Sequence, residues 1–252
     1  MSADHPSHYA VLIDADNVSA NFAKPMFEEV ASIGEASIRR IYGDFSGTAP
    51  QGWTKETLAE LAIQPYQQFA NTRQKNASDI ALVIDAMDIL HSGRFDGFVL
   101  VTSDSDFTRL ASRIREQGLN VIGMGERKTP ASFVAACKRF VYLENLLDEP
   151  ADDAESAKPT KDKAPVSRPP RKVPPSKAVP LILRALRSIR SDSEWVGLGQ
   201  LGQVLLSNTP EFDARNYEGT DKLSTLLEKS GHFEVRTGPS NGLLVREKPN
   251  GK

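Results

Sequence analysis

The sequence predicts an α/β protein with a doubly wound, mostly parallel sheet, followed by a small domain of three helices and a β-hairpin. Three observations support this expectation. Apolar runs of strand length alternate with helical patterns up to about residue 147, a proline-rich charged segment follows, and helical patterns dominate the remainder. Strands that alternate with helices are typical of right-handed βαβ units, and such units build a parallel sheet.

Five strands are expected in the first half, with a helix after each of them. The strands are YAVLID (9–14), ASIRRIYGDF (36–45), IQPYQQFA (63–70), GFVLVTS (97–103) and NVIGMG (120–125). Pro65 counts against the third run, because proline lacks a backbone N–H. Helical patterns cover 21–34, 52–62, 78–93, 106–118 and 130–140, and VYLENL (141–146) predicts a short extra strand. Ser78 is the expected N-cap of the third helix, which ends near Gly93.

A linker is expected between the two halves. Half of the chain's sixteen prolines fall between Asp148 and Pro180, in a stretch without aromatic residues that opens acidic and turns basic. This composition cannot bury enough apolar surface to offset the entropy of ordering, so it predicts a disordered tether. We therefore expect domains at 1–147 and 178–252, joined by a Pro-rich charged linker at 148–177, with no interface between them.

The last part of the chain predicts a winged helix-turn-helix domain. Three helical patterns, PLILRALRSI (180–189), GLGQLGQVLLSN (197–208) and TDKLSTLLEKSG (220–231), precede the β-patterned run FEVRTGPSNGLLVRE (233–247). GPSNG is the turn of that hairpin. Three helices followed by a hairpin are typical of this fold.

Composition and charge indicate a soluble, cytoplasmic protein. The net charge of −2 gives no overall attraction to nucleic acid or membranes, so any such attraction must be local. No apolar run approaches the roughly 20 residues needed to span a bilayer, and the first residues lack the pattern of a secretory signal. The single cysteine, Cys137, lies in an apolar segment and predicts a buried structural thiol in a reducing compartment.

Carboxylates follow the predicted strands where ligands bind in such sheets. Asp14 and Asp16, with Asn17 beside them, follow the first strand, and Asp104 and Asp106 follow the fourth. In the usual strand order 3-2-1-4-5 these two strands are neighbours at the switch point, and ligands bind outside their carboxyl ends. The helix after the third strand begins at the same edge and carries Asp79 in its first turn. Carboxylates from three distant segments are therefore expected in one crevice.

Oxygen ligands of this kind select hard cations, Mg²⁺ or Mn²⁺. Such ions activate a water and neutralise the oxygens of a phosphoryl displacement, so the cluster suits metal-dependent phosphodiester hydrolysis. The four histidines are scattered and no Cys or His spacing favours zinc. We expect Asp85 and Asp88, on other faces of the Asp79 helix, to be solvated. Asp44 ends the second strand, where it could border the crevice, but an ordinary turn is the expected role.

These residues resemble the NYN family, a branch of the PIN-like metal-dependent nucleases. The similar segments are VLIDADNV (11–18), NASDIALVIDAMDIL (76–90) and GFVLVTSDSDFTRLASRIREQGLNVIGMG (97–125), and the resemblance spans about 8–147. It implies a Rossmann-like fold and RNA cleavage or processing. By position it implies catalytic, metal-binding roles for Asp14, Asp79, Asp104 and Asp106, and a catalytic role for Asn17. Asp16 is a further metal-ligand candidate.

The C-terminal part resembles the LOTUS domain, also called OST-HTH. The similar features are Trp195 with Val196, the segment PEFDARNYEG (210–219) and a Leu-rich third helix that leads into FEV. That resemblance implies RNA binding or contacts with a protein partner. Trp195, Phe212, Tyr217 and Phe233 are expected to pack in the core and turns rather than to stack on bases.

An acidic crevice needs a basic rim to attract RNA phosphates. Arg73 and Lys75 precede the Asp79 helix, and Arg127 and Lys128 follow the fifth strand, so all four are RNA-binding candidates at that edge. Ordinary solvated loop charge explains them equally well.

Two other functions remain open. DADN (14–17) also resembles the start of a HAD-type phosphatase motif, but that motif requires a hydroxyl side chain at position 18, which is valine. The alternative from another class is a catalytically silent RNA-binding adaptor. Metal-dependent turnover of labelled RNA distinguishes the three.

Overall fold

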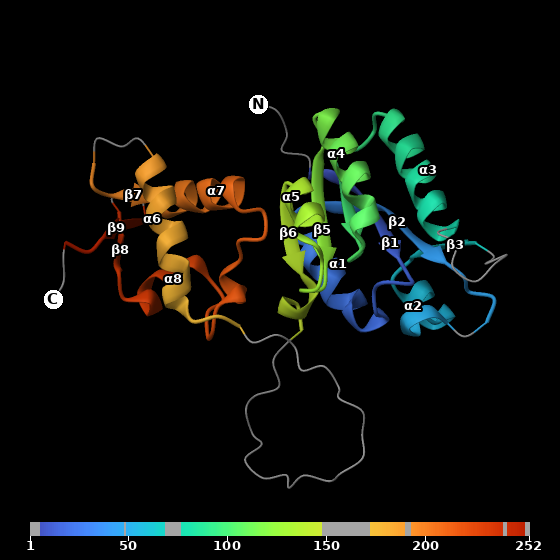
Figure 1. Cartoon of the computed structure of the whole chain (residues 1–252), viewed down its shortest axis with the longest axis horizontal. Coiled ribbons are helices and arrows are strands. Elements are labelled where there is room, and N and C mark those ends of the chain that lie inside the picture. The colour runs from blue at the N-terminus through green and yellow to red at the C-terminus, as the bar shows by residue number, and fades with distance from the viewer. Residues whose placement is uncertain are drawn as a thin grey trace, which may run out of the picture.

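The computed structural model describes residues 6–47, 49–68, 77–147, 172–189, 193–238 and 241–249. Arg73, Lys75 and the predicted linker from 148 to 171 lie outside the described residues. Figure 1 shows two domains side by side, an α/β domain drawn in blue to yellow-green and a smaller domain drawn in orange to red.

The first domain is built on one parallel sheet. Its strands are β1 (His8–Asp14), β2 (Glu35–Gly43), β3 (Gln64–Gln67), β4 (Gly97–Val101), β5 (Asn120–Gly125) and β6 (Arg139–Tyr142). They lie in the order β3-β2-β1-β4-β5-β6, which confirms the predicted order of the first five. Pro65 is tolerated because β3 is an edge strand, where a missing N–H costs no ladder hydrogen bond.

Helices cover both faces of this sheet, as predicted. On one face α1 (Ala23–Ala31) and α2 (Lys55–Glu60) pack on the core that contains Val11 and Ile13 of β1. On the other, α3 (Ala77–His91), α4 (Thr108–Glu116) and α5 (Ala131–Ala136) pack on Ala10 and Leu12. Alternate residues of β1 thus enter different cores, which explains its continuous apolar run.

The end of the first domain differs from the prediction. The expected helix 130–140 ends at Ala136, and the expected strand at 141–146 lies earlier, as β6, before a 3₁₀ turn at Leu143–Asn145. Pairing with β5 overrides the helical pattern, because it buries Phe140 over Gly123, where any Cβ would lie 2.5 Å from the ring. Cys137 is buried as predicted, and burial raises the pKa of its thiol to about 12, so it is unreactive.

Of the three further carboxylates, Asp85 was predicted wrongly. It forms an ion pair with Arg40 and accepts a hydrogen bond from the Tyr42 hydroxyl, since its face of α3 lies over β2. Asp88 is exposed, as expected. Asp44 belongs to a turn, also as expected, where it accepts from the backbone N–H of Ser46 at 2.9 Å.

The second domain has the predicted helices and hairpin around its own core. Its helices are α6 (Val179–Ser188), α7 (Leu198–Asn208) and α8 (Leu223–Ser230), with short 3₁₀ turns at Pro175–Ala178 and Ala214–Asn216. The hairpin strands β8 (Phe233–Thr237) and β9 (Leu243–Glu247) are joined by β7 (Val196–Gly197) in the order β7-β9-β8. The sequence analysis missed β7, since two residues are too short to leave a pattern.

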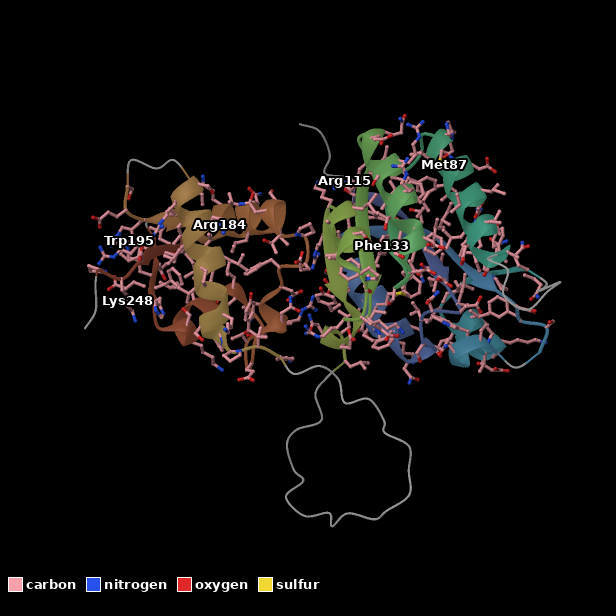
Figure 2. The ribbon with its side chains drawn as sticks, viewed as in Figure 1. Met87, Arg115, Phe133, Arg184, Trp195 and Lys248 are labelled. Atoms are coloured by element: carbon pink, nitrogen blue, oxygen red, sulfur yellow. The ribbon has the colours of Figure 1, made fainter. Side chains whose placement is uncertain are left out.

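Three of the four aromatic residues pack as expected, because Phe212, Tyr217 and Phe233 are buried. Trp195 is different. It is half-buried, and the guanidinium carbons of Arg236 and Arg246 lie 3.9 and 4.6 Å from its ring centroid. It lies at the end of this domain that points away from the first domain (Figure 2).

Two expectations about the domain boundary need correction. The second domain begins before residue 178, because Val173 bridges to Tyr217 and a 3₁₀ turn follows at once. The two domains also share an interface, since the backbone N–H of Phe140 donates to the carbonyl of Pro210 at 2.8 Å. No helix in the described part of the chain is long and apolar enough to cross a membrane.

Candidate active site

The carboxyl ends of β1 and β4 lie side by side and carry four of the predicted site carboxylates. Asp14 is the last residue of β1, and Ile13 pairs with Val101 at the end of β4. Asp104 and Asp106 follow that end within three and five residues. Exposure increases outward from Asp14, which is 1% exposed, through half-buried Asp104 to exposed Asp16 and Asp106. The strand order therefore places these side chains at one edge of the sheet, where solvent reaches all of them except Asp14.

Three donors hold the buried carboxylate of Asp14. The Thr102 hydroxyl donates to Oδ2 at 2.8 Å, the Asn17 side-chain amide donates to Oδ2 at 2.7 Å, and the Asp16 N–H donates to Oδ1 at 3.2 Å. Burial raises the pKa of Asp14, the charge of Asp16 adds to this, and the hydrogen bonds from Thr102 and Asn17 oppose it. The site thus orients one carboxylate firmly.

The loop after β4 folds back on itself through its first aspartate. Asp104 caps the 3₁₀ turn at Ser105–Phe107 by accepting from the N–H of Asp106 at 2.9 Å. The Asp104 N–H in turn donates to Thr102 Oγ1 at 3.1 Å. Thr102 therefore connects Asp14 on β1 with Asp104 after β4. The sequence analysis missed Thr102, although a buried-strand hydroxyl just before two aspartates was a usable signal.

Asp79, in the first turn of α3, belongs to the same electrostatic cluster. Its pKa is raised to about 6, first by burial and then by the charges of Asp14, Asp104, Asp16 and Asp106. Repulsion of this kind acts only between near neighbours in a partly desolvated site. The prediction that carboxylates of three distant segments converge is in keeping with this shift.

Asp16 also contacts α3 directly. The Ser78 hydroxyl donates to its Oδ2 at 3.2 Å, so Ser78 links the β1 loop to this helix. Because α3 already includes Ala77, Ser78 lies inside the helix rather than at the expected N-cap.

The carboxylates are not gathered tightly around one point. Among the residues that the structure describes, no group of three or more His, Cys, Asp or Glu side chains is arranged closely enough to hold a metal ion. The donor chemistry is nevertheless that of a hard-cation site, since carboxylate and amide oxygens are the ligands that Mg²⁺ and Mn²⁺ prefer. Binding one ion with several of these groups would require side-chain rotations.

The described basic candidates already have partners. Arg127 donates from Nη2 to Asn145 Oδ1 at 2.7 Å and to Asn216 Oδ1 at 3.3 Å, and its guanidinium lies over the Tyr142 ring. Lys128 is exposed and lies 3.0 Å from Glu126. RNA contact by Arg127 would require it to leave these partners, so its predicted role and that of Lys128 stay predictions.

The sequence matches the NYN domain over residues 8–144, more than half of the chain. The chain belongs to the NYN domain family. A second match, to the OST-HTH/LOTUS domain, covers residues 174–245. Both resemblances stated from the sequence motifs are confirmed, and the pairing of an NYN with an OST-HTH/LOTUS domain supports a ribonuclease or RNA-associated role.

Solved structures add little beyond this. A protein of unknown function from Vibrio parahaemolyticus is 23% identical, with a TM-score of 0.47 over 56% of this chain and 96% of that one. An uncharacterized protein from Nitrosomonas europaea is 28% identical, with a TM-score of 0.27 over 40% of this chain and 95% of that one. No conclusion rests on them, because both TM-scores are below 0.5. No curated protein matches the chain.

Proposed function

We propose that the protein is a ribonuclease that hydrolyses RNA phosphodiester bonds with the help of Mg²⁺ or Mn²⁺. The reaction takes place at the carboxyl ends of β1 and β4, the sheet edge that carries Asp14 and is called the Asp14 edge below. The observation that carries the proposal is the Thr102 hydroxyl, which joins the buried carboxylate of Asp14 at the end of β1 to the backbone of Asp104 after β4. Asp16 and Asp106 follow the same two strand ends. Burial, and then the charges of Asp14, Asp104, Asp16 and Asp106, raise the pKa of Asp79, and a bound cation would offset this repulsion.

The residues suited to hold such an ion are Asp14, Asp79, Asp104 and Asp106, with Asp16 as an additional candidate. A bound divalent ion would lower the pKa of a coordinated water and offset charge on the phosphate oxygens. The remaining roles belong to the protein itself. Asn17 and Thr102 fix the orientation of Asp14, and the turn capped by Asp104 fixes the direction of that carboxylate.

A second candidate function is an RNA-binding adaptor without turnover. It is favoured by one observation, that the described carboxylates form no ready group of three metal ligands. A HAD-type phosphatase has less support, because the side chain at position 18 is a fully buried valine without a hydroxyl.

Product analysis separates the three functions. The full chain is incubated with internally labelled RNA, single-stranded and structured, in Mg²⁺, Mn²⁺ or EDTA. A ribonuclease shortens the RNA in the presence of metal and not in EDTA. An adaptor retards the RNA on a native gel without shortening it, and a phosphatase releases only terminal phosphate.

A further inference from the structure

The outer edge of β6 is covered by the second domain. β6 is the last strand of the sheet, and an edge strand presents unpaired backbone groups that invite pairing with another segment. Here the Phe140 N–H donates to the carbonyl of Pro210, at 2.8 Å. Pro210 begins the PEFDARNYEG segment between α7 and α8, so that segment faces the sheet edge (Figure 1).

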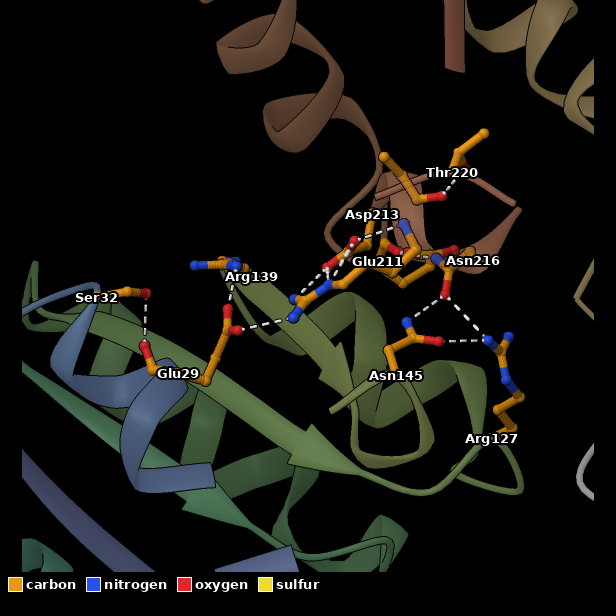
Figure 3. Close-up of polar contacts among 11 residues, drawn as sticks. Glu29, Ser32, Arg127, Arg139, Asn145, Glu211, Asp213, Asn216 and Thr220 are labelled. Carbon is orange, nitrogen blue, oxygen red and sulfur yellow. Dashed lines mark hydrogen bonds and ion pairs between the residues drawn. The ribbon is translucent and has the colours of Figure 1, made fainter. Parts of the chain in front are cut away.

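A charge network crosses the same boundary. The carboxylate of Glu29 on α1 lies 2.6 Å from Arg139 of its own domain and 2.9 Å from Arg215 of the other (Figure 3). Its side chain is only 11% exposed, so the charge is largely removed from water. The Arg215 guanidinium donates to the Asp213 carboxylate from Nε at 3.0 Å and from Nη2 at 2.6 Å. A buried carboxylate that depends on cations from both domains opposes their separation.

A cluster of side-chain amides lies beyond the carboxyl end of β6. Asn216 Oδ1 accepts from the Asn145 amide at 2.8 Å and from Arg127 at 3.3 Å, and Arg127 also donates to Asn145 (Figure 3). The Asn216 amide donates to the Glu211 carbonyl at 2.8 Å. The side-chain amides of Asn145 and Asn216 each donate one hydrogen bond and accept at least one. Because both functions of each amide are used, the contact depends on geometry as well as on charge.

This amide cluster is connected to the strand-end carboxylates through Glu126, the residue before Arg127. The Glu126 N–H donates to Ser103 Oγ at 2.9 Å, and Ser103 precedes Asp104. The Arg127 N–H donates to Glu144 Oε1 at 2.9 Å. The loop between β5 and α5 is therefore held on one side by the second domain and on the other by the residue beside Asp104.

We propose that the docking of the second domain on the β6 edge holds the β5–α5 loop against Ser103, the residue before Asp104. Arg215 secures the domain, and Asn216 acts through Arg127 as a positioning residue. The partner of this surface is the PEFDARNYEG segment of the same chain. The proposal does not depend on RNA hydrolysis, because it concerns domain position and loop order.

Domain position is tested with two spin labels on the full chain. Cys137 is buried, so labels attach at the introduced cysteines of Glu116→Cys and Glu228→Cys, two exposed positions in different domains. We expect one narrow inter-label distance distribution that broadens when Arg215→Ala is added. Lys24→Ala, which breaks the exposed Lys24–Glu60 pair, serves as the matched control and leaves it narrow. A broad distribution without Arg215→Ala overturns docking.

Loop order is tested by hydrogen–deuterium exchange of the peptide that contains Glu126. We expect Arg215→Ala and Asn216→Ala to speed exchange there several-fold, with no change in Lys24→Ala. Reaction of Cys137 with a thiol reagent reports whether each variant keeps its fold, because that thiol is exposed only by unfolding. Unchanged exchange at Glu126 in a variant whose domains have separated overturns the coupling to the loop.

Discussion

The Thr102 hydroxyl donates to Asp14 Oδ2 at 2.8 Å, across the boundary between β4 and β1. Thr102 Oγ1 also accepts from the Asp104 N–H at 3.1 Å, so one hydroxyl joins the ends of β1 and β4. Both Thr102 and Asp14 are 1% exposed, and water is therefore no substitute for this contact.

Thr102→Val keeps the shape of the side chain and removes this donor. We expect the pKa of Asp14 to rise further and the free energy of unfolding at pH 7 to fall by about 1–3 kcal/mol, the usual cost of leaving a buried polar group unsatisfied. Urea unfolding measures the loss. Thr237→Val, at an exposed strand position, is the control, and an equal effect of the two substitutions would contradict the role of Thr102.

The pH dependence of stability follows from Asp79. Its pKa in the folded state is about 6, raised from an ordinary value of 3.8, so the folded protein binds this proton more tightly than the unfolded chain does. The resulting stabilisation is complete below pH 3.8 and is lost as pH rises through 6. Asp79→Asn should therefore gain stability relative to the unmodified protein as pH rises from 4 to 7 in EDTA.

This dependence is measured by urea unfolding at pH 4, 5, 6 and 7. The exposed Asp88 of the same helix provides the matched control, and Asp88→Asn should show no such trend. If the free energies of unfolding of Asp79→Asn and the unmodified protein differ by the same amount at every pH in this range, the pKa of Asp79 is not raised in the folded state.

Divalent cations should stabilise the folded protein. An ion that binds only the native state at a concentration 100 times its Kd adds about 2.7 kcal/mol, which raises the melting temperature. We expect this rise with Mg²⁺ or Mn²⁺ and its loss in Asp14→Asn, while Asp88→Asn retains it. A rise of the same size with NaCl at matched ionic strength would indicate charge screening rather than a bound ion.

Gly123 should tolerate no larger residue, because β6 packs directly on it. A Cβ there would lie 2.5 Å from the Phe140 ring and 2.7 Å from Cys137 Sγ. Gly123→Ala is expected to cost about 1–3 kcal/mol of unfolding free energy through overpacking. Gly199→Ala, where nothing lies within 4 Å of the new atom, is the comparison, and a similar cost at both positions would refute this packing argument.

Much of the fold was predictable because its signals are local. Each buried strand of the sheet appears in the sequence as an apolar run. The alternation of strands with helices predicts a parallel sheet in which β1 and β4 are neighbours. The errors arose where tertiary contacts override local pattern. Arg139 and Phe140 are predicted as the end of a helix, because no local pattern reports that β5 is available to pair with them.

The site was predictable in part for the same reason. Strand ends indicated Asp14 and Asp104, but the partner of Asp85 is Arg40, 45 residues away, and no local pattern reports that pair. The contact between Glu29 and Arg215 joins residues 186 apart in different domains. Such pairs depend on how domains and layers pack, which charge and periodicity along the chain do not encode.

The central claim is that the Asp14 edge hydrolyses RNA with a divalent cation. It is tested most directly by the single-turnover rate of RNA cleavage in Mn²⁺ or Mg²⁺, compared between Asp104→Asn and its control Asp88→Asn. We predict that Asp104→Asn lowers the rate on the order of 100-fold or more and that Asp88→Asn leaves it unchanged. Equal cleavage by both variants, or cleavage that persists in EDTA, would contradict the claim.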